Sequence, residues 1–221
     1  MIVSHKFKCI IIQPRKTAGT SLTELFKMID PEVEETYEEY NPPVPPYNHQ
    51  PASECRKIVG EEIWNSYYKF AFVREPFNWV RSYYMHERKA WWSNQHPTYK
   101  LVGMTLRWQQ QIPLEGNTIT PDNFLSLYTL MKWWYPPRGI VGQSSWFDEE
   151  LDHIGIFENL RDEIKFLGTK LGFDYDLMPH SNKSKSNTVQ LHSDTYQLIN
   201  VLLREDIEFY EKYRLLSIEQ R

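Results

Sequence analysis

Residues 9–21 say most about the fold of this 221-residue chain, and they read Cys9-Ile10-Ile11-Ile12-Gln13-Pro14-Arg15-Lys16-Thr17-Ala18-Gly19-Thr20-Ser21. The apolar, β-branched run in the first half is typical of a buried strand, which we expect from Lys6 to Gln13. A polar turn follows, and beyond it apolar residues recur at helical spacing. The segment therefore predicts a strand, a short turn and a helix that begins with a capping box of Ser21 and Glu24.

A strand, turn and helix of this composition are suited to binding an anion. The unpaired amides of the first helical turn point into the loop and the helix dipole favours negative charge. Gly19 lets the backbone approach a ligand closely, and Lys16 adds a full positive charge. The loop is not a Walker A motif, because Lys16 precedes Gly19 by three residues and no glycine comes earlier. This order disfavours ATP or GTP as the ligand.

The rest of the chain alternates strands and helices in the same way. We expect further buried strands over 69–73 and 153–157, and helices over 53–64, 77–89, from 120, from 158 to 172, and over 194–213. Strands that alternate with helices predict an α/β protein. The expected architecture is a three-layer P-loop-like fold, in which helices flank a central, mostly parallel sheet.

The length suits one domain spanning residues 1–221. Two segments depart from the alternation. Residues 30–51 contain six prolines and many acidic residues, which predicts an irregular excursion. Residues from about 90 to 142 are expected to form a helical insertion.

Composition excludes several classes of protein. There are 25 Lys and Arg against 29 Asp and Glu, which gives a net charge of −4. The chain therefore lacks the excess of basic residues that is typical of a nucleic-acid binder. The longest wholly apolar runs have four residues, Cys9–Ile12 and Phe70–Val73, so no membrane insertion is expected. The first predicted strand begins near the start of the chain, and we expect a soluble, cytoplasmic protein. The two cysteines form neither a disulfide framework nor a zinc pattern.

A second candidate anion site combines Arg74 and Ser82. Arg74 follows the predicted strand 69–73, at the carboxyl end where ligands collect in open parallel sheets. Ser82 lies about two turns into the next helix, so a guanidinium and a hydroxyl are able to hold one phosphate from two sides. A magnesium-binding NTPase often has Asp where this chain has Arg74. Between Arg74 and Arg107 there are six basic and two acidic residues, a locally positive stretch.

These two motifs resemble a known family. Residues Lys16 to Ser21 resemble the 5′-phosphosulfate loop, and Arg74-Glu75-Pro76 through Ser82 the 3′-phosphate motif, of sulfotransferases that use 3′-phosphoadenosine-5′-phosphosulfate (PAPS). The likeness is closest to the carbohydrate and heparan-type branch and its bacterial relatives. Segments 64–84, 154–160 and 180–184 look like family segments in the family's order. The sequence departs from the usual form at Arg15, which intervenes between Pro14 and Lys16.

The resemblance implies in-line transfer of a sulfuryl group from PAPS, without a metal, to a hydroxyl or amine of a carbohydrate or small molecule. Lys16 would stabilise the charge on the leaving phosphate, and His49 is the first candidate for the general base, ahead of His86, His96 and Glu54. The donor would be held by Arg15, Lys16, Thr17, Ala18, Gly19, Thr20, Ser21, Arg74, Ser82, Lys183 and Ser184. Glu158 is expected to have a structural role at the end of its strand.

Two other functions remain open at this point. A P-loop-type kinase would need only the first anion-binding loop. A catalytically inactive relative would keep the nucleotide or carbohydrate site without turnover. The insertion at 90–142, on the acceptor side, resembles no one substrate class. An acidic chain favours a neutral sugar or small hydroxylated metabolite at least as well as a strongly anionic glycan.

Overall fold

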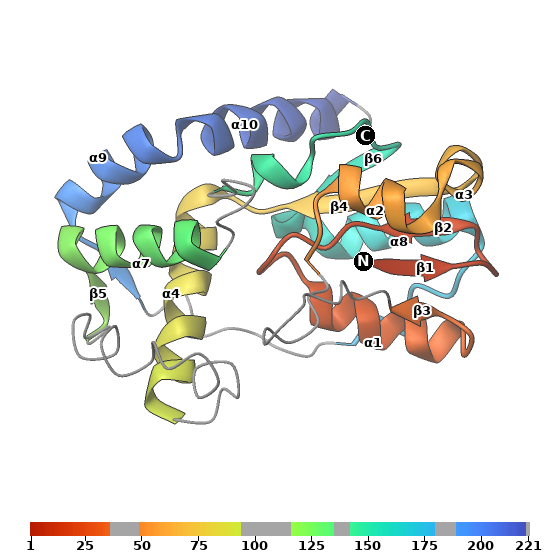
Figure 1. Ribbon diagram of the computed structural model, residues 1–221, viewed down its shortest axis with the longest axis horizontal. Helices are drawn as coiled ribbons and strands as arrows, with labels where there is room; N and C mark the ends of the chain where they lie inside the picture. The colour runs from red at the N-terminus through yellow and green to blue at the C-terminus, as the bar shows by residue number, and fades with distance from the viewer. Residues whose placement is uncertain (36–48, 94–115, 135–141, 180–188, 220–221) are drawn as a thin grey trace.

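The computed structural model describes residues 1–35, 49–93, 116–134, 142–179 and 189–219. Its elements in these ranges, drawn in Figure 1, are β1 (Ile2–Ser4), β2 (Cys9–Ile11), α1 (Gly19–Ile29), β3 (Glu34–Glu35), α2 (Ala52–Val59), α3 (Glu61–Ser66), β4 (Tyr68–Val73), α4 (Pro76–Ser93), β5 (Thr118–Ile119), α7 (Pro121–Trp134), the 3-10 turn η1 (Ser144–Trp146), β6 (His153–Ile156), the 3-10 turn η2 (Phe157–Asn159), α8 (Leu160–Leu171), β7 (Gln190–Leu191), α9 (Ser193–Leu202) and α10 (Arg204–Glu219).

The main sheet has the strand order β3-β1-β2-β4-β6. Strands β2, β4 and β6 are parallel neighbours, whereas β1 is antiparallel to both β2 and β3. Four of these five strands therefore run in one direction, since β3 is antiparallel to the one reversed strand. The predicted α/β fold, with a mostly parallel sheet flanked by helices, is confirmed.

The start of the sheet differs from the prediction of one strand over residues 6–13. Ile2–Ser4 pair with Cys9–Ile11 as an antiparallel hairpin, and residues 5–8 form its turn. Lys8 has a φ of 48°, a left-handed conformation that ends strand pairing there. The polar residues at 5, 6 and 8 are thus explained by a turn rather than by a strand.

Side chains alternate between the two faces of the sheet. Cys9 and Ile11 of β2, with Phe70 and Phe72 of β4, pack against α1 and α8. Their neighbours Ile10, Ile12 and Ala71 point to the other face and pack against α2 and α3. On that second face Val73 also contacts Tyr210 of α10. The period of two along each strand buries both faces and makes the three layers visible in Figure 1.

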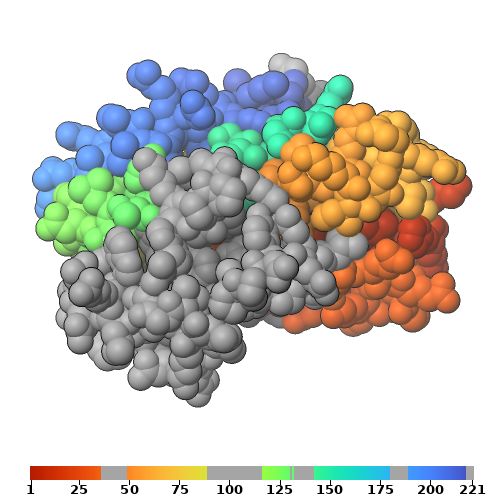
Figure 2. Space-filling model, in the orientation of Figure 1, coloured from red at the N-terminus to blue at the C-terminus, as the bar shows by residue number. Residues whose placement is uncertain are grey.

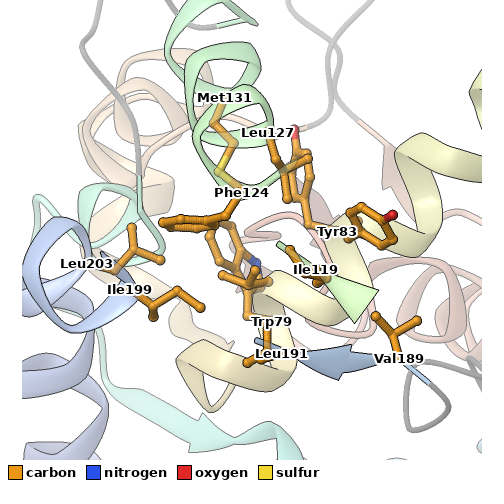
Figure 3. Packing of buried hydrophobic residues seen from close by; sticks show 12 residues of the cluster. Trp79, Tyr83, Ile119, Phe124, Leu127, Met131, Val189, Leu191, Ile199 and Leu203 are labelled. Carbon is orange, nitrogen blue, oxygen red and sulfur yellow. The ribbon is translucent and has the colours of Figure 1, made fainter. Parts of the chain in front are cut away.

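A separate apolar cluster lies beside the sheet. It joins α4, α7, α9 and the small parallel sheet of β5 and β7, and Figure 3 shows its side chains converging. Its largest members are Trp79 and Tyr83 of α4 and Phe124 of α7, all essentially inaccessible. Because α4 begins directly after β4, this cluster holds the helix that leaves the sheet.

Several helix boundaries differ from prediction. The helix expected over 53–64 is two helices, broken at Gly60 with φ 81°, and the one over 194–213 is broken at Leu203. The start at Pro121 is confirmed, since the Asn123 amide donates to Thr120 Oγ1 (3.3 Å). So is the end of α8 at Gly172, which has φ 80°.

The predicted capping box at Ser21 is wrong. Helix α1 begins two residues earlier, at Gly19, and its N-cap is Ala18, with φ 72° and no side-chain cap. Ser21 is therefore inside the first turn, where it is buried. The polar turn is tighter than the sequence pattern indicated, because left-handed residues shorten it.

The two irregular segments are described in part. Residues 36–48 of the predicted excursion lie outside the described ranges, while Glu34–Glu35 pair with β1. Residues 94–115 and 135–141 of the insertion also lie outside them. In the described remainder of the insertion, α7 is helical as expected, but Thr118–Ile119 form a strand, which corrects the purely helical prediction.

Candidate functional site

The carboxyl ends of β2, β4 and β6 meet at one edge of the sheet, because these strands are parallel. The β2–α1 loop (residues 12–18), Arg74 and Phe157 follow the three strands. Nη1 of Arg74 donates to the Lys16 carbonyl (3.3 Å), and the guanidinium carbon lies 4.4 Å from the centroid of the Phe157 ring. The structure thus brings together the two motifs predicted from sequence, which are 58 residues apart.

The β2–α1 loop has an alternating backbone conformation. Lys16 and Ala18 have φ values of 66° and 72°, and Thr17 lies between them. In proteins, left-handed residues next to right-handed ones turn successive N–H groups toward one side, an arrangement that suits an anion. Left-handed residues other than glycine cost about 1–3 kcal/mol each, so the surroundings must hold them. The buried Thr17 hydroxyl, which donates to the Pro14 carbonyl (2.7 Å), is one such restraint.

The other predicted donor-binding residues have different exposures. Gly19 and Thr20 open α1, with Thr20 exposed and Ser21 buried. A Cβ on Gly19 would be in ordinary contact, 3.5 Å from Nε2 of Gln13, so the loop's positive φ values, and not Gly19, mark its special geometry. Ser82 is buried on α4. Lys183 and Ser184 lie outside the described residues.

Arg74 is a buried cation, 8% exposed. Burial lowers the pKa of its guanidinium, against the opposing influence of Glu158 and Glu75. In the described part of the chain no carboxylate makes an ion pair with it, and its Nε has no hydrogen-bond partner. Glu158 and Glu75 act on this charge from beyond ion-pair distance, and a buried N–H donor without a partner is costly. The arrangement fits an anionic ligand group beside Arg74.

A second buried polar atom without a partner, among the described residues, is Oε1 of Gln13. Its Nε2 donates to the Gly19 carbonyl and to Thr23 Oγ1, both at 3.2 Å. Gln13 therefore spans the β2–α1 loop from within. An unsatisfied acceptor oxygen fits a hydroxyl or amine donor rather than an anion. Both buried side-chain atoms that lack partners in the described ranges thus lie at this one edge of the sheet.

His49 lies against the same loop. Its Nδ1 donates to the Gln13 carbonyl (2.7 Å), and its own carbonyl accepts from Nε1 of Trp146 (3.2 Å). Because a carbonyl only accepts, Nδ1 carries the proton and the lone pair of the neutral ring is on Nε2. Burial and the charges of Arg15 and Lys16 lower the pKa of His49 to about 3. The ring is therefore neutral near pH 7, so Nε2 is able to accept a proton, but as a weaker base than an ordinary imidazole.

Arg15 joins the loop to α4. Its Nη1 donates to the Tyr83 hydroxyl (2.5 Å), with the guanidinium carbon 5.1 Å from the ring centroid. Its carbonyl accepts from Nε1 of Trp79 (2.7 Å). Arg15 thus gives the loop two hydrogen bonds with the helix that carries Ser82.

Glu158 has the structural role expected from the sequence. Its carboxylate accepts from the Glu75 amide at 3.2 Å from both oxygens. Glu75 in turn accepts from the amides of Phe77 and Asn78 and so caps α4. The ends of β4 and β6 are joined in this way to the start of α4.

Sequence reasoning missed two residues that contact Arg74 or its support. Gln143 bonds to the main chain of Arg74, and Asp206 of α10 bonds to the main chain of Gln143. Neither stands in a motif, and no spacing signal could have found them. Of the weaker base candidates, Glu54 pairs with Lys57 on α2, His86 is partly buried on α4, and His96 lies outside the described residues.

Two features are absent from the part of the chain that the structure describes. No cluster of three or more His, Cys, Asp or Glu side chains in these ranges is arranged to hold a metal ion. In the same ranges, every helix is too short or too polar to cross a bilayer.

No protein-family model and no curated protein sequence matches this chain. Among solved structures, a sulfotransferase from Alicyclobacillus acidocaldarius is similar to it. The alignment covers 93% of this chain and 94% of that one, with 14% sequence identity and a TM-score of 0.40. At this level of similarity, any function must rest on the site residues themselves.

Proposed function

We propose that this chain is a sulfotransferase that transfers a sulfuryl group from PAPS to a hydroxyl or amine of a carbohydrate or small-molecule acceptor. One observation supports the proposal: the buried Arg74, which makes no ion pair among the described residues, donates to the Lys16 carbonyl in a loop with two left-handed residues. Two adjacent sites for anions suit a donor with two separate anionic groups. A single-domain, cytoplasmic enzyme is part of the same proposal.

The donor's two ends would use different elements. The 5′-phosphosulfate fits the amides and cation of residues 15–21, and the 3′-phosphate fits Arg74 and Ser82. The Nε of Arg74 is a buried donor that has no partner in the described structure. A phosphate oxygen is an acceptor and would supply that partner. Lys183 and Ser184 are proposed to close over the nucleotide.

Transfer would proceed in line. The acceptor oxygen forms a bond to sulfur as the bond from sulfur to the bridging phosphate oxygen breaks, and 3′,5′-ADP leaves. Lys16 would stabilise the charge that develops on that phosphate. The acceptor proton would pass to Nε2 of His49, the nitrogen that carries the lone pair.

A kinase and an inactive relative are the competing functions. A kinase is disfavoured by Lys16 preceding Gly19 and by Arg74 at the end of β4. An inactive relative would bind the nucleotide and turn over no acceptor.

Calorimetric titration with 3′,5′-ADP, with and without magnesium and beside ATP, tests the donor class. We expect binding of 3′,5′-ADP at micromolar or lower Kd, independent of magnesium, and little response to ATP. Absence of 3′,5′-ADP binding would refute the proposal, and a magnesium-dependent response to ATP would favour the kinase. With binding established, PAPS and a panel of neutral sugars and hydroxylated metabolites test for turnover.

Three variants separate the proposed roles. Lys16→Ala should lower kcat by about 10²–10³-fold, as loss of a transition-state donor does. Arg74→Ala should chiefly weaken 3′,5′-ADP binding. His49→Ala should reduce turnover while nucleotide affinity is kept, and near-normal turnover would move the base assignment to another residue.

A further inference from the structure

The main chain of Arg74 lies just beyond the end of the sheet's hydrogen-bond ladder. The pairing of β4 with β6 ends at Val73, opposite Ile156. One side chain, Gln143, supplies the partners that a neighbouring strand would give. Its Oε1 accepts from the Arg74 amide (2.8 Å), and its Nε2 donates to the Arg74 carbonyl (2.7 Å). Gln143 is 0% exposed, so water does not compete for these bonds.

Gln143 is itself held by a carboxylate from the C-terminal helix. Asp206, in the first turn of α10, accepts from the main-chain N–H of Gln143 (2.7 Å). It also accepts from the main-chain N–H and the hydroxyl of Ser144 (3.0 and 2.6 Å). A Cβ on Gly142 would overlap this carboxylate, so glycine is required for the close approach. Asp206 is buried and makes no ion pair within the described ranges. The three hydrogen bonds from Gln143 and Ser144 stabilise the buried carboxylate.

The segment that follows Gln143, residues 144–148, is held by α2 on one side and by α10 on the other. Ser53 of α2 donates its amide and hydroxyl to Asp148 (2.9 and 2.5 Å), and Phe147 stacks on Phe209 of α10 with ring centroids 4.7 Å apart. Figure 2 shows this segment, in green, between α2 in orange and α10 in blue. Gln143 therefore bonds to the end of β4 from a segment that contacts both α2 and α10.

We propose that Gln143, held by Asp206, is a positioning residue that aims the guanidinium of Arg74 at the donor's 3′-phosphate. The inference rests on the proposed function. Gln143 holds the backbone from which the Arg74 side chain starts, while the Lys16 carbonyl and the Phe157 ring contact its tip. A guanidinium recognises phosphate through directional bonds, so a shift of its backbone weakens recognition even though the charge remains.

The test uses the ratio of two dissociation constants measured by calorimetry, that of 5′-AMP divided by that of 3′,5′-ADP. This ratio reports on the 3′-phosphate alone, because the nucleoside and 5′-phosphate are common to both ligands. Gln143→Met keeps the volume of the side chain and removes both bonds to Arg74. We expect it to lower the ratio by about tenfold, the scale of a lost charge-assisted bond. Arg74→Ala gives the lower limit of the ratio.

Thr195→Val is the matched control. It removes a buried bond from a side chain to a main-chain carbonyl, Thr195 Oγ1 to Ile119 (2.7 Å), and this bond involves neither Arg74 nor Gln143. We expect it to lower thermal stability and to leave the ratio unchanged. Asp206→Asn is a second test variant should Gln143→Met not fold, and it should lower the ratio in the same direction. Circular dichroism establishes that each titrated variant is folded.

The outcomes separate the two proposals. A ratio that falls in Gln143→Met or Asp206→Asn but not in Thr195→Val supports the positioning role. An unchanged ratio in the folded variants overturns it, while a lowered ratio in Arg74→Ala would still support the donor site. If the wild-type protein does not bind 3′,5′-ADP, the proposed function fails and this inference fails with it.

Discussion

His49 illustrates how neighbouring residues set the chemistry of a single side chain. A histidine in water has a pKa near 6.5, whereas burial and the charges of Arg15 and Lys16 lower the pKa of His49 to about 3. The bond from Nδ1 to the Gln13 carbonyl fixes which nitrogen carries the lone pair. The ring is thus held neutral and in one tautomer, beside the residues proposed to bind the donor.

This environment predicts a specific dependence of stability on pH. Between about pH 6.5 and pH 3 the unfolded chain protonates His49 and the folded chain does not, so stability is lost as the pH falls through this window. One such proton contributes a slope of up to about 1.4 kcal/mol per pH unit. His49→Gln should reduce the slope, since a carboxamide can bond to the Gln13 carbonyl but does not titrate. Urea unfolding at several pH values down to 4.5 measures it, and an unchanged slope would contradict the titration of His49 as its cause.

At the scale of elements, the pairing of β4 with β6 depends on one glycine. Phe72 lies opposite Gly155, and a Cβ on Gly155 would be 2.7 Å from the Phe72 ring. Both strands end at the candidate site, one before Arg74 and the other before Phe157. The glycine lets a large ring fill the space between the sheet and α8 without pushing these ends apart.

Gly155→Ala should therefore destabilise the fold by about 1–3 kcal/mol, the usual cost of an overpacked core. Gly19→Ala is the matched control for stability. Its new Cβ would make an ordinary contact at 3.5 Å, and it lies in a helix, where alanine is favoured over glycine. We expect Gly19→Ala to be neutral or slightly stabilising. Chemical denaturation of both variants measures the difference, and equal stabilities would contradict the steric argument.

At the scale of the whole molecule, two bodies of apolar packing meet at α4. The sheet and its flanking helices form one, and the cluster of α4, α7 and α9 forms the other (Figure 3). Helix α4 starts at the carboxyl edge of the sheet and carries Ser82 and Tyr83 on its buried side. The site's geometry consequently depends on this packing too, because Trp79 and Tyr83 of the cluster bond to Arg15 of the β2–α1 loop.

Phe124→Ala tests this dependence. The ring is 0% exposed in the cluster, and its truncation should cost about 3–5 kcal/mol of unfolding free energy. Leu125→Ala, at the neighbouring position, is the control: Leu125 is 42% exposed, so the change should be within about 0.5 kcal/mol. Thermal or urea unfolding distinguishes the two. A small effect of Phe124→Ala would show that the cluster contributes little to stability.

Much of the fold can be predicted from local patterns of apolar and polar residues in the sequence. The apolar runs at 9–12 and 70–73 and the helical spacing after residue 19 predicted β2, β4 and α1, and Thr120-Pro121 predicted the start of α7. The two-residue strands β3, β5 and β7 were missed, because so short a strand has no periodicity of its own. The left-handed Lys16 and Ala18 were missed for a related reason, since neither residue type favours that conformation.

The sequence alone determined the order of the strands and helices and the two basic motifs, because hydrophobic period and strand-end chemistry are properties of short segments. Tertiary structure decided what holds Arg74. Its backbone bonds to Gln143, that residue bonds to Asp206, and the guanidinium contacts Phe157. These residues come from four separate elements or segments and share no spacing. They meet only because parallel strands end at one edge of the sheet and the C-terminal helix packs across it.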